Sequence, residues 1–159
     1  MYTIRQINLG LEDMEKLRAE ASREGFDFME TLFEQWSSGE QRFSQPGEVL
    51  CGCFDQGKLI AVGGLTIDPF CESPEVGRIR RVYVRAAWRN RGIGRMLVTH
   101  LVEEARKSFT AVRLRAESGD AARLYERMGF TPVDSADASH ILHLTGSPSL
   151  PVACNTAAI

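Results

Sequence analysis

Basic residues and glycines gather in one short stretch near the middle of the chain. The stretch reads Arg89-Asn90-Arg91-Gly92-Ile93-Gly94-Arg95. Glycine lets an anion approach the backbone closely. The first N–H groups of a helix have no intrahelical partner and lie at the positive end of the helix dipole. Arginine side chains add charge-assisted hydrogen bonds to phosphate oxygens. If a helix begins here, these residues predict a binding site for a phosphate-bearing ligand.

The residues on either side predict the elements that would position this loop. Val82, Tyr83 and Val84 are β-branched or aromatic and predict a strand that leads into the loop. Between Ile93 and Ala105, apolar residues recur at helical spacing and predict an amphipathic helix. A strand, a glycine loop and a helix in this order form an arrangement that binds phosphate groups.

Two other glycine-loop motifs fit this stretch poorly. A P-loop requires Gly-Lys-Ser/Thr, whereas Gly94 is followed by Arg95 and Met96. A dinucleotide fingerprint requires a third glycine at the position where Leu97 stands. An ordinary structural joint between a strand and a helix is the remaining alternative for this stretch taken alone.

A second pattern lies further along the chain, in a short predicted helix. This helix is expected to begin at Ser118 or Asp120, whose side chains favour the N-cap position, and to end at Gly129, which favours the C-cap. The residues that make the pattern are Ala121, Tyr125, Gly129 and Phe130.

Together the two patterns resemble the signature of the GCN5-related N-acetyltransferase (GNAT) family. That family's first motif reads Arg or Gln, two residues, Gly, one residue, and Gly or Ala, which residues 89–94 match. Its second motif reads Asn, two residues, Ala, three residues, Tyr, three residues and Gly-Phe. The chain matches this motif except at the asparagine, where Ser118 stands. The resemblance extends over residues 2–144 and is specific in residues 81–94 and 121–130.

The resemblance implies the fold class. We expect an α/β protein with a mixed sheet, the single-domain acyl-CoA N-acyltransferase fold, with about seven strands and about four helices. Its fourth and fifth strands would splay apart, and acetyl-CoA would lie in the gap between them. The domain would occupy residues 1–144. Residues 145–159 carry no charged side chain and are expected to form a C-terminal tail, either loose or packed.

The resemblance also implies roles for individual residues. Tyr125 would be the general acid that protonates the leaving thiolate, because its reference pKa of about 10 lies only a little above the roughly 8.5 of a thiol. The backbone N–H of Val82 would donate to the thioester oxygen as negative charge develops there. The residues expected to bind acetyl-CoA are Val82, Val84, Arg89, Asn90, Arg91, Gly92, Ile93, Gly94, Arg95, Ser118, Ala121 and Tyr125.

The general base is harder to assign. An alkyl ammonium with a pKa near ~10.4 must lose a proton before it can attack, which costs about 4–5 kcal/mol at pH 7. Many family members carry a glutamate near positions 78–80, where this chain has Arg78 and Arg80. Glu75 is the first candidate here, with Glu72, Asp68 or a water relayed from backbone carbonyls as alternatives.

Arg78 and Arg80 alternate with Ile79 and would share one face of the strand. We hypothesise that one of them contacts an anionic part of the acceptor, such as an amino-acid carboxylate. An ion pair with one of the chain's own acidic residues is an equally good interpretation.

Composition limits the class of protein. The chain has 159 residues, of which 43% are hydrophobic and 25% charged, as expected for one folded domain. Its first residues lack an apolar signal segment and no stretch resembles a membrane span, so we expect a cytoplasmic protein with no membrane partner. The histidines show no metal-ligand spacing, so no metal is expected.

The charge distribution favours one anionic ligand. The net charge is −2, yet 7 of the 19 basic residues lie between Arg78 and Arg95. We therefore expect an enzyme that transfers an acetyl group from acetyl-CoA to a primary amine by direct attack in a ternary complex. A small amine, an amino-acid derivative or an antibiotic is favoured as acceptor over a protein, and a homodimer is compatible with the resemblance.

Two alternatives remain open for the function of the chain. The first is a non-catalytic acyl-CoA-binding module that uses the same glycine loop. The second is a nucleic-acid binder that uses the arginine-rich strip, although few aromatic residues are interleaved with those arginines.

Overall fold

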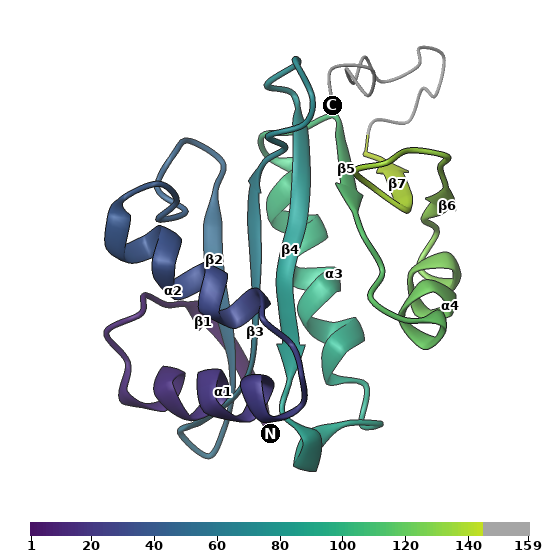
Figure 1. Cartoon of the computed structure of the whole chain (residues 1–159). Coiled ribbons are helices and arrows are strands. Elements are labelled where there is room, and N and C mark those ends of the chain that lie inside the picture. The colour runs from purple at the N-terminus through teal and green to yellow at the C-terminus, as the bar shows by residue number, and fades with distance from the viewer. Residues whose placement is uncertain (145–159) are drawn as a thin grey trace.

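The structure is a computed structural model and describes residues 1–144. Seven β-strands form one mixed sheet in this part of the chain (Figure 1). The strands are β1 (Tyr2–Gln6), β2 (Val49–Asp55), β3 (Lys58–Ile67), β4 (Val76–Val84), β5 (Ala111–Leu114), β6 (Thr131–Pro132) and β7 (His140–His143). Their order in the sheet is β1-β2-β3-β4-β5-β7-β6. The predicted mixed sheet is thereby confirmed, whereas the predicted tail at residues 145–159 lies outside the described residues.

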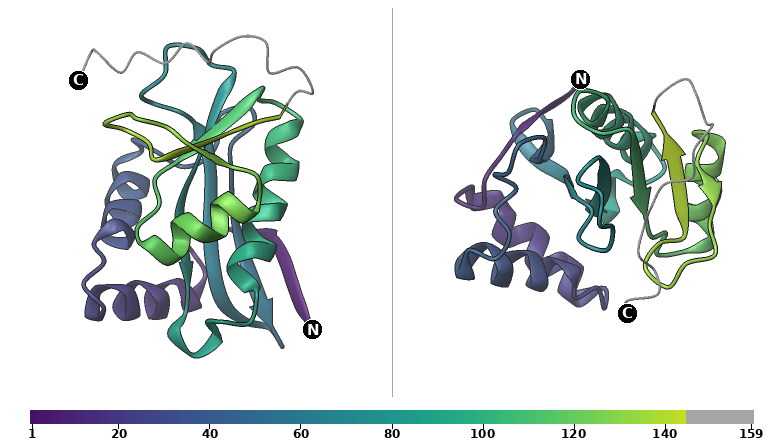
Figure 2. Two further views of the ribbon diagram at one scale, coloured as in Figure 1. Left: turned by 90° about the vertical axis from the view of Figure 1, so that its right-hand side faces the viewer. Right: turned by 90° about the horizontal axis from the view of Figure 1, so that it is seen from above.

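Helices cover both faces of this sheet (Figure 2). They are α1 (Glu12–Arg23), α2 (Phe28–Ser38), the short 3-10 helix η1 (Ala86–Trp88), α3 (Ile93–Arg106) and α4 (Gly119–Arg127). Helices α1 and α2 lie on one face, and α3 lies on the other. Helix α4 lies beside the β5, β6 and β7 end of the sheet. No helix of the described residues is long and apolar enough to cross a membrane.

Each face of the sheet has its own apolar core. On one face, Met14 and Leu17 of α1 and Leu32 of α2 are buried with residues of β2 and β3. On the other face, Leu97 and Leu101 of α3 are buried against β3, β4 and β5. The helical period of these apolar residues accounts for both arrangements, since each helix turns one apolar stripe towards the sheet.

A β-bulge interrupts the pairing of β3 and β4. Val62 pairs with Tyr83, but Gly64 pairs with Arg80, so β4 has one residue more than β3 between these two pairs. Arg81 takes up the extra length with a φ of 60°, a left-handed conformation that is uncommon outside glycine. The alternation of side chains along β4 changes at this point.

Strands β4 and β5 run parallel but remain paired only briefly. The pairs join the first three residues of β4 to β5, and the last of them is Arg78 with Arg113. Beyond Arg78, β4 continues to Val84 without a partner on this side, and the two strands diverge (Figure 1). The predicted splay is therefore present, and it leaves backbone N–H and C=O groups of β4 open to a ligand.

Candidate active site

A cavity of about 240 Å³ lies where β4 and β5 diverge. Its walls come from the start of α2, the loop between β3 and β4, the middle of β4, the end of β5 with the segment after it, and α4. The residues that line it are Phe28, Phe70, Arg78, Ile79, Arg80, Arg81, Val82, Leu114, Arg115, Glu117 and Tyr125. We call it the splay cavity.

A second cavity of about 610 Å³ lies beside the glycine loop. It is bounded by the loop, by the N-terminus of α3 and by the exposed side of α4. The residues that line it are Val84, Trp88, Arg89, Asn90, Gly92, Ile93, Gly94, Arg95, Asp120, Ala121, Arg123, Leu124 and Arg127. We call it the loop cavity.

Strand β4 and helix α4 line both cavities. Val82 borders the splay cavity, and Val84, two residues further along the same strand, borders the loop cavity. In the same way, Tyr125 of α4 borders the splay cavity, and Ala121, one helical turn earlier, borders the loop cavity. An extended ligand could therefore run along the unpaired edge of β4 from one cavity to the other.

The backbone of the glycine loop fits an anion site. Gly92 is the N-cap of α3 with a φ of 79°, and no side chain caps the helix there. The first turn of α3 contains no acidic residue. Its first N–H groups thus lack intrahelical acceptors, and no side chain competes for them. Arg95 also borders the loop cavity, whereas the exposed Arg91 does not.

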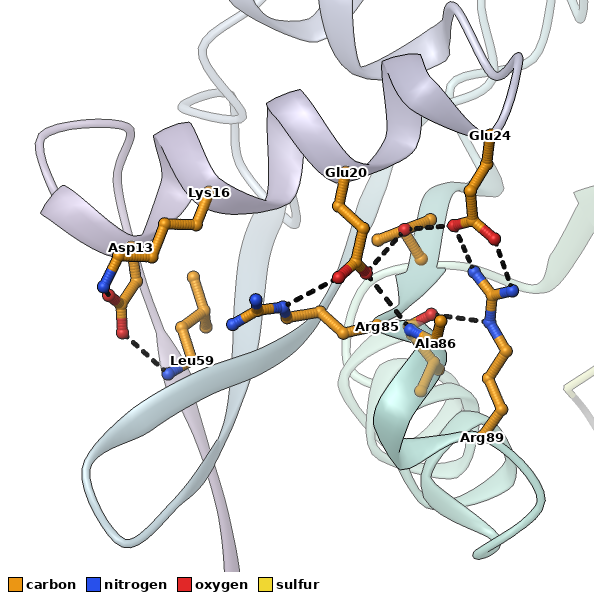
Figure 3. Close-up of polar contacts among 10 residues, drawn as sticks. Asp13, Lys16, Glu20, Glu24, Leu59, Arg85, Ala86 and Arg89 are labelled. Atoms are coloured by element: carbon orange, nitrogen blue, oxygen red, sulfur yellow. Dashed lines mark hydrogen bonds and ion pairs between the residues drawn. The ribbon is translucent and has the colours of Figure 1, made fainter.

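The Arg89 side chain is already engaged within the protein. Its Nη1 and Nη2 donate to the Glu24 carboxylate at 2.7 and 2.6 Å, and its Nε donates to the Val84 carbonyl at 3.0 Å (Figure 3). These bonds connect the end of α1 to the glycine loop. The guanidinium of Arg89 holds the loop in place, and the backbone around it is what the loop cavity offers to a ligand.

Further carboxylate contacts tie α1 to the end of β4 and the start of η1 (Figure 3). The Tyr83 hydroxyl bonds to both Glu20 and Glu24, and the backbone N–H of Ala86 donates to Glu20 at 3.1 Å. Burial, reinforced by the bonds to Glu24 and Glu20, raises the pKa of Tyr83 well above its usual range. The hydroxyl therefore stays protonated and continues to donate.

The family model described as the acetyltransferase (GNAT) family matches residues 11–130, three quarters of the chain. This chain belongs to the GNAT family. The match includes both cavities and both motifs, and the GNAT fold accounts for the splayed strands around which the cavities lie.

Solved structures have the same GNAT architecture. A candidate acetyltransferase from Exiguobacterium sp. 255-15 is 27% identical and superposes with a TM-score of 0.80 over 90% of this chain and 93% of that one. The ribosomal-protein-S18-alanine N-acetyltransferase of Escherichia coli is 19% identical, with a TM-score of 0.68 over 95% and 99%. The protein yncA of Salmonella typhimurium, solved with its cofactor acetyl-CoA, is 14% identical, with a TM-score of 0.70 over 93% and 96%.

Tyr125, the predicted general acid, lies on the wall of the splay cavity. Its side chain is 8% exposed and makes no hydrogen bond to any residue that the structure describes. Burial raises the pKa of Tyr125 to about 12, with a smaller contribution from the nearby Glu117 carboxylate. The phenol is therefore protonated at physiological pH, but the raised pKa makes it a weaker acid than a free tyrosine and widens the gap to the pKa of about 8.5 of a thiol.

Val82 and Ser118 lie on opposite sides of the gap. Val82 falls within the β-bulge and has no Cα partner in the register of β3 and β4. Ser118 is the N-cap of α4, and its hydroxyl oxygen accepts from the N–H of Ala121 at 3.1 Å. The serine at the family's asparagine position therefore has a local structural task.

The predicted base candidates lie outside the splay cavity. Glu75 and Glu72 are exposed and precede β4 at the end where it is still paired with β5. Asp68 is 1% exposed and lies between Arg78 and Arg113, with oxygen-to-nitrogen distances of 3.6 and 3.5 Å. None of these carboxylates faces the ligand path along β4.

Of the described residues that line the splay cavity, only Glu117 carries a carboxylate. Glu117 and Arg81 are the charged cavity residues of most chemical interest among those that the sequence analysis missed. Glu117 lies three residues after the end of β5, on the side where the strands separate, and a carboxylate at this position could have been recognised from the sequence. Arg81 enters the cavity because of the bulge, for which the residues of β4 alone give no signal.

Proposed function

We propose that this protein transfers the acetyl group of acetyl-CoA to a primary amine in a ternary complex. The observation that carries the proposal is the pair of cavities joined along the unpaired edge of β4. One cavity offers helix-start N–H groups for phosphates, and the other offers a buried phenol, a carboxylate and an unpaired strand backbone for the reaction.

The residues present fit acetyl-CoA. The N–H groups of residues 93–95 at the start of α3 would bind the pyrophosphate, with Arg95 beside them. The pantetheine arm would run along β4 and take hydrogen bonds from the backbone between Val84 and Val82, as an added strand does. The acetyl group would then reach the splay cavity, next to Tyr125.

The reaction moves one acetyl group from sulfur to nitrogen, and an acceptor that arrives as an ammonium loses two protons, one before the attack and one as the amide forms, while the thiolate gains one. The amine nitrogen forms a bond with the thioester carbonyl carbon, and the carbon–sulfur bond breaks. The N–H of Val82 stabilises the negative charge that develops on the carbonyl oxygen. Tyr125 gives its proton to the leaving thiolate, and the amine loses a proton to a base.

We assign Glu117 as that base, in place of Glu75. It is the carboxylate that lines the cavity, and it is close enough to Tyr125 to affect the pKa of the phenol. A base and an acid on the same cavity could exchange the net proton after each turnover through solvent, because Glu117 is exposed.

The cavity favours a small acceptor. About 240 Å³ holds a small molecule or one side chain together with the acetyl group. The fold itself does not choose the acceptor. Among its solved relatives, the Escherichia coli enzyme is named for an alanine of a ribosomal protein, whereas the glucosamine-6-phosphate N-acetyltransferase of Arabidopsis thaliana, 20% identical with a TM-score of 0.62, is named for an amino sugar.

Tyr125→Phe separates an enzyme from a non-catalytic acyl-CoA-binding module. Amines would be incubated with acetyl-CoA, and both CoA release and the mass of the acetylated product would be followed. We expect turnover with wild type and a fall of roughly 100-fold in kcat for Tyr125→Phe, with acetyl-CoA affinity within about twofold of wild type. The matched control is Tyr2→Phe on β1, outside both cavities, which should leave both values unchanged. Binding of acetyl-CoA without turnover on any amine would favour the module.

A further inference from the structure

Arg80 and Arg81 are consecutive in β4, yet both line the splay cavity. Side chains of consecutive residues in a regular strand point to opposite faces of the sheet. The bulge breaks this rule, because Arg81 adopts a φ of 60° and takes up the extra residue of β4. The chain thus holds an uncommon backbone conformation at the point where it brings a second guanidinium into the cavity.

The cavity has two more arginines, but both are paired with protein groups. Arg78 lies 3.6 Å from an Asp68 oxygen and donates to the Asp137 carbonyl at 2.6 Å. Arg115 donates to the Ala136 carbonyl. Each of these two side chains therefore has an acceptor within the protein, although the buried Nη1 of Arg78 makes no hydrogen bond in the described residues.

Arg80 and Arg81 have far fewer partners. The Arg80 side chain makes no hydrogen bond or ion pair with any residue in the described part of the chain, and the Arg81 side chain makes one hydrogen bond, to the neutral Gln35 side chain at 3.3 Å. Burial lowers the pKa of both guanidiniums, that of Arg80 to about 10, and their mutual repulsion adds to the effect on Arg80. Such charges are costly to keep unless an anion joins them.

The phosphates of acetyl-CoA do not supply that anion in the proposed binding mode. The pyrophosphate belongs in the loop cavity, beyond Val84, whereas Arg80 and Arg81 border only the splay cavity. Glu117 on the same cavity attracts the charge of Arg81, and Asp68 and Glu48 attract that of Arg80, but none of these carboxylates forms an ion pair with either guanidinium in the described residues. An anion that binds both guanidiniums directly would therefore come with the other substrate.

We propose that the acceptor is a small amine that carries an oxyanion, a carboxylate or a phosphate ester, bound between Arg80 and Arg81. This inference rests on the proposed function and narrows its substrate class. Two guanidiniums can bind the oxygens of one such group through several charge-assisted bonds. Phe28 and Phe70 line the same cavity and offer an apolar surface to the carbon atoms between the anion and the amine. Arg78, named with Arg80 in the sequence hypothesis, is replaced in this role by Arg81.

Matched pairs of amines test the substrate class. β-Alanine would be compared with β-alaninamide, and phosphoethanolamine with ethanolamine, by kcat/KM at saturating acetyl-CoA. In at least one pair, we expect kcat/KM for the member that carries the carboxylate or phosphate to exceed kcat/KM for the member without it at least 30-fold. The pair with the larger ratio tells whether a carboxylate or a phosphate is the natural group. Equal kcat/KM values within both pairs would overturn the proposal.

Arg80→Met and Arg81→Met should each remove most of this preference. The KM of the preferred oxyanion-bearing amine should rise at least 10-fold. The KM values of the amines without an oxyanion and of acetyl-CoA should stay within about twofold of wild type. The control is Arg23→Met, which removes an exposed arginine at the end of α1 and should change nothing. A preference that survives both variants would contradict the assignment.

Anion binding without catalysis separates this inference from the proposed function. Inorganic phosphate and malonate should raise the Tm of wild type and of Arg23→Met by several degrees, and the Tm of Arg80→Met and Arg81→Met by less than half as much. If acetyl-CoA binds and neutral amines are acetylated but no such difference appears, the anion site alone fails. If the anion effect appears but acetyl-CoA does not bind, the proposed function fails while the anion site stands.

Discussion

The carboxylate of Glu24, the residue after α1, forms two hydrogen bonds with the guanidinium of Arg89 in the glycine loop, at 2.7 and 2.6 Å. The two residues are 65 positions apart in the chain. Arg89 is the first residue of the glycine-loop motif, yet its charge is directed at Glu24 after α1. The pair connects the helices on one face of the sheet to the site where the cofactor phosphates are proposed to bind.

Glu24→Gln should therefore weaken acetyl-CoA binding without touching the ligand. The amide loses the charge that fixes Arg89, so the loop becomes less ordered before binding. We expect the Kd for acetyl-CoA, measured by calorimetry, to rise 3- to 10-fold. The matched control is Glu103→Gln, whose ion pair with Arg106 lies within α3 at 3.3 Å. An unchanged Kd for Glu24→Gln would show that the bridge does not order the loop.

The same bridge predicts a pH dependence of stability. The Arg89 hydrogen bonds, followed by the Tyr83 hydroxyl, hold the pKa of Glu24 below its usual value of 4.5. A carboxyl group with a lowered pKa in the folded state stabilises the fold above its unfolded pKa, and this contribution disappears as the pH falls through the folded pKa. The Tm of wild type should exceed that of Glu24→Gln at pH 7 and approach it below pH 4. A difference that is constant from pH 7 to pH 3 would contradict the assignment.

Gly92 and Gly94 should respond differently to alanine. Gly92 has a φ of 79°, so Gly92→Ala strains the backbone even though no atom lies within 4 Å of the added carbon. Gly94 has ordinary helical geometry, and a Cβ there would meet Val84 only at 3.8 Å. We expect Gly92→Ala to cost about 1 kcal/mol of stability and to weaken acetyl-CoA binding several-fold. Gly94→Ala should preserve both the stability and the affinity for acetyl-CoA. Equal losses of stability and affinity in the two variants would contradict the prediction.

Glu117→Gln tests the base. If Glu117 removes the amine proton, kcat/KM for the amine should fall roughly 100-fold at pH 7. The deficit should shrink as the pH rises towards 10, because more of the amine is then already deprotonated in solution. Glu75→Gln, outside the cavity, is the control and should behave as wild type. A deficit that does not depend on pH would indicate that Glu117 only supports the structure of the site.

Arg80→Met should stabilise the ligand-free protein. The lowered pKa of Arg80 means that its charge is disfavoured in the fold, and this cost is present at every pH below about 10, where the guanidinium is charged. Methionine retains much of the apolar stem and removes the charge. We expect Tm to rise by about 2–4 °C at pH 7, as about 1 kcal/mol would produce in a protein of this size. A lower Tm would mean that Arg80 is satisfied without an anion.

Much of this structure could be predicted from local patterns in the sequence, because helices and helix caps depend on residues that lie close together in the chain. The spacing of apolar residues after Gly92 predicted α3, and Ser118 and Gly129 marked the ends of α4. The strand before the loop could be predicted in the same way, since Val82 and Val84 are residue types that favour strands. The resemblance to the GNAT signature then supplied the splay that these local patterns alone would not have shown.

The rest depends on contacts between residues that lie far apart in sequence. The bulge at Arg81 is a mismatch in register between β3 and β4, and the residue types of β4 do not predict it. The engagement of Arg89 by Glu24 requires that α1 be folded over the loop. For the same reason Arg78 could not be separated from Arg80 beforehand, because Asp68, which pairs with Arg78, comes from the loop after β3.

Calorimetric titration of acetyl-CoA into the protein tests the central claim most directly, with NAD and ATP as controls and Gly92→Ala as the comparison variant. The account predicts saturable one-to-one binding of acetyl-CoA, no comparable binding of the two nucleotides, and weaker binding by the variant. Absence of acetyl-CoA binding, or binding that Gly92→Ala does not alter, would contradict the assignment of the glycine loop and with it the proposed acetyl transfer.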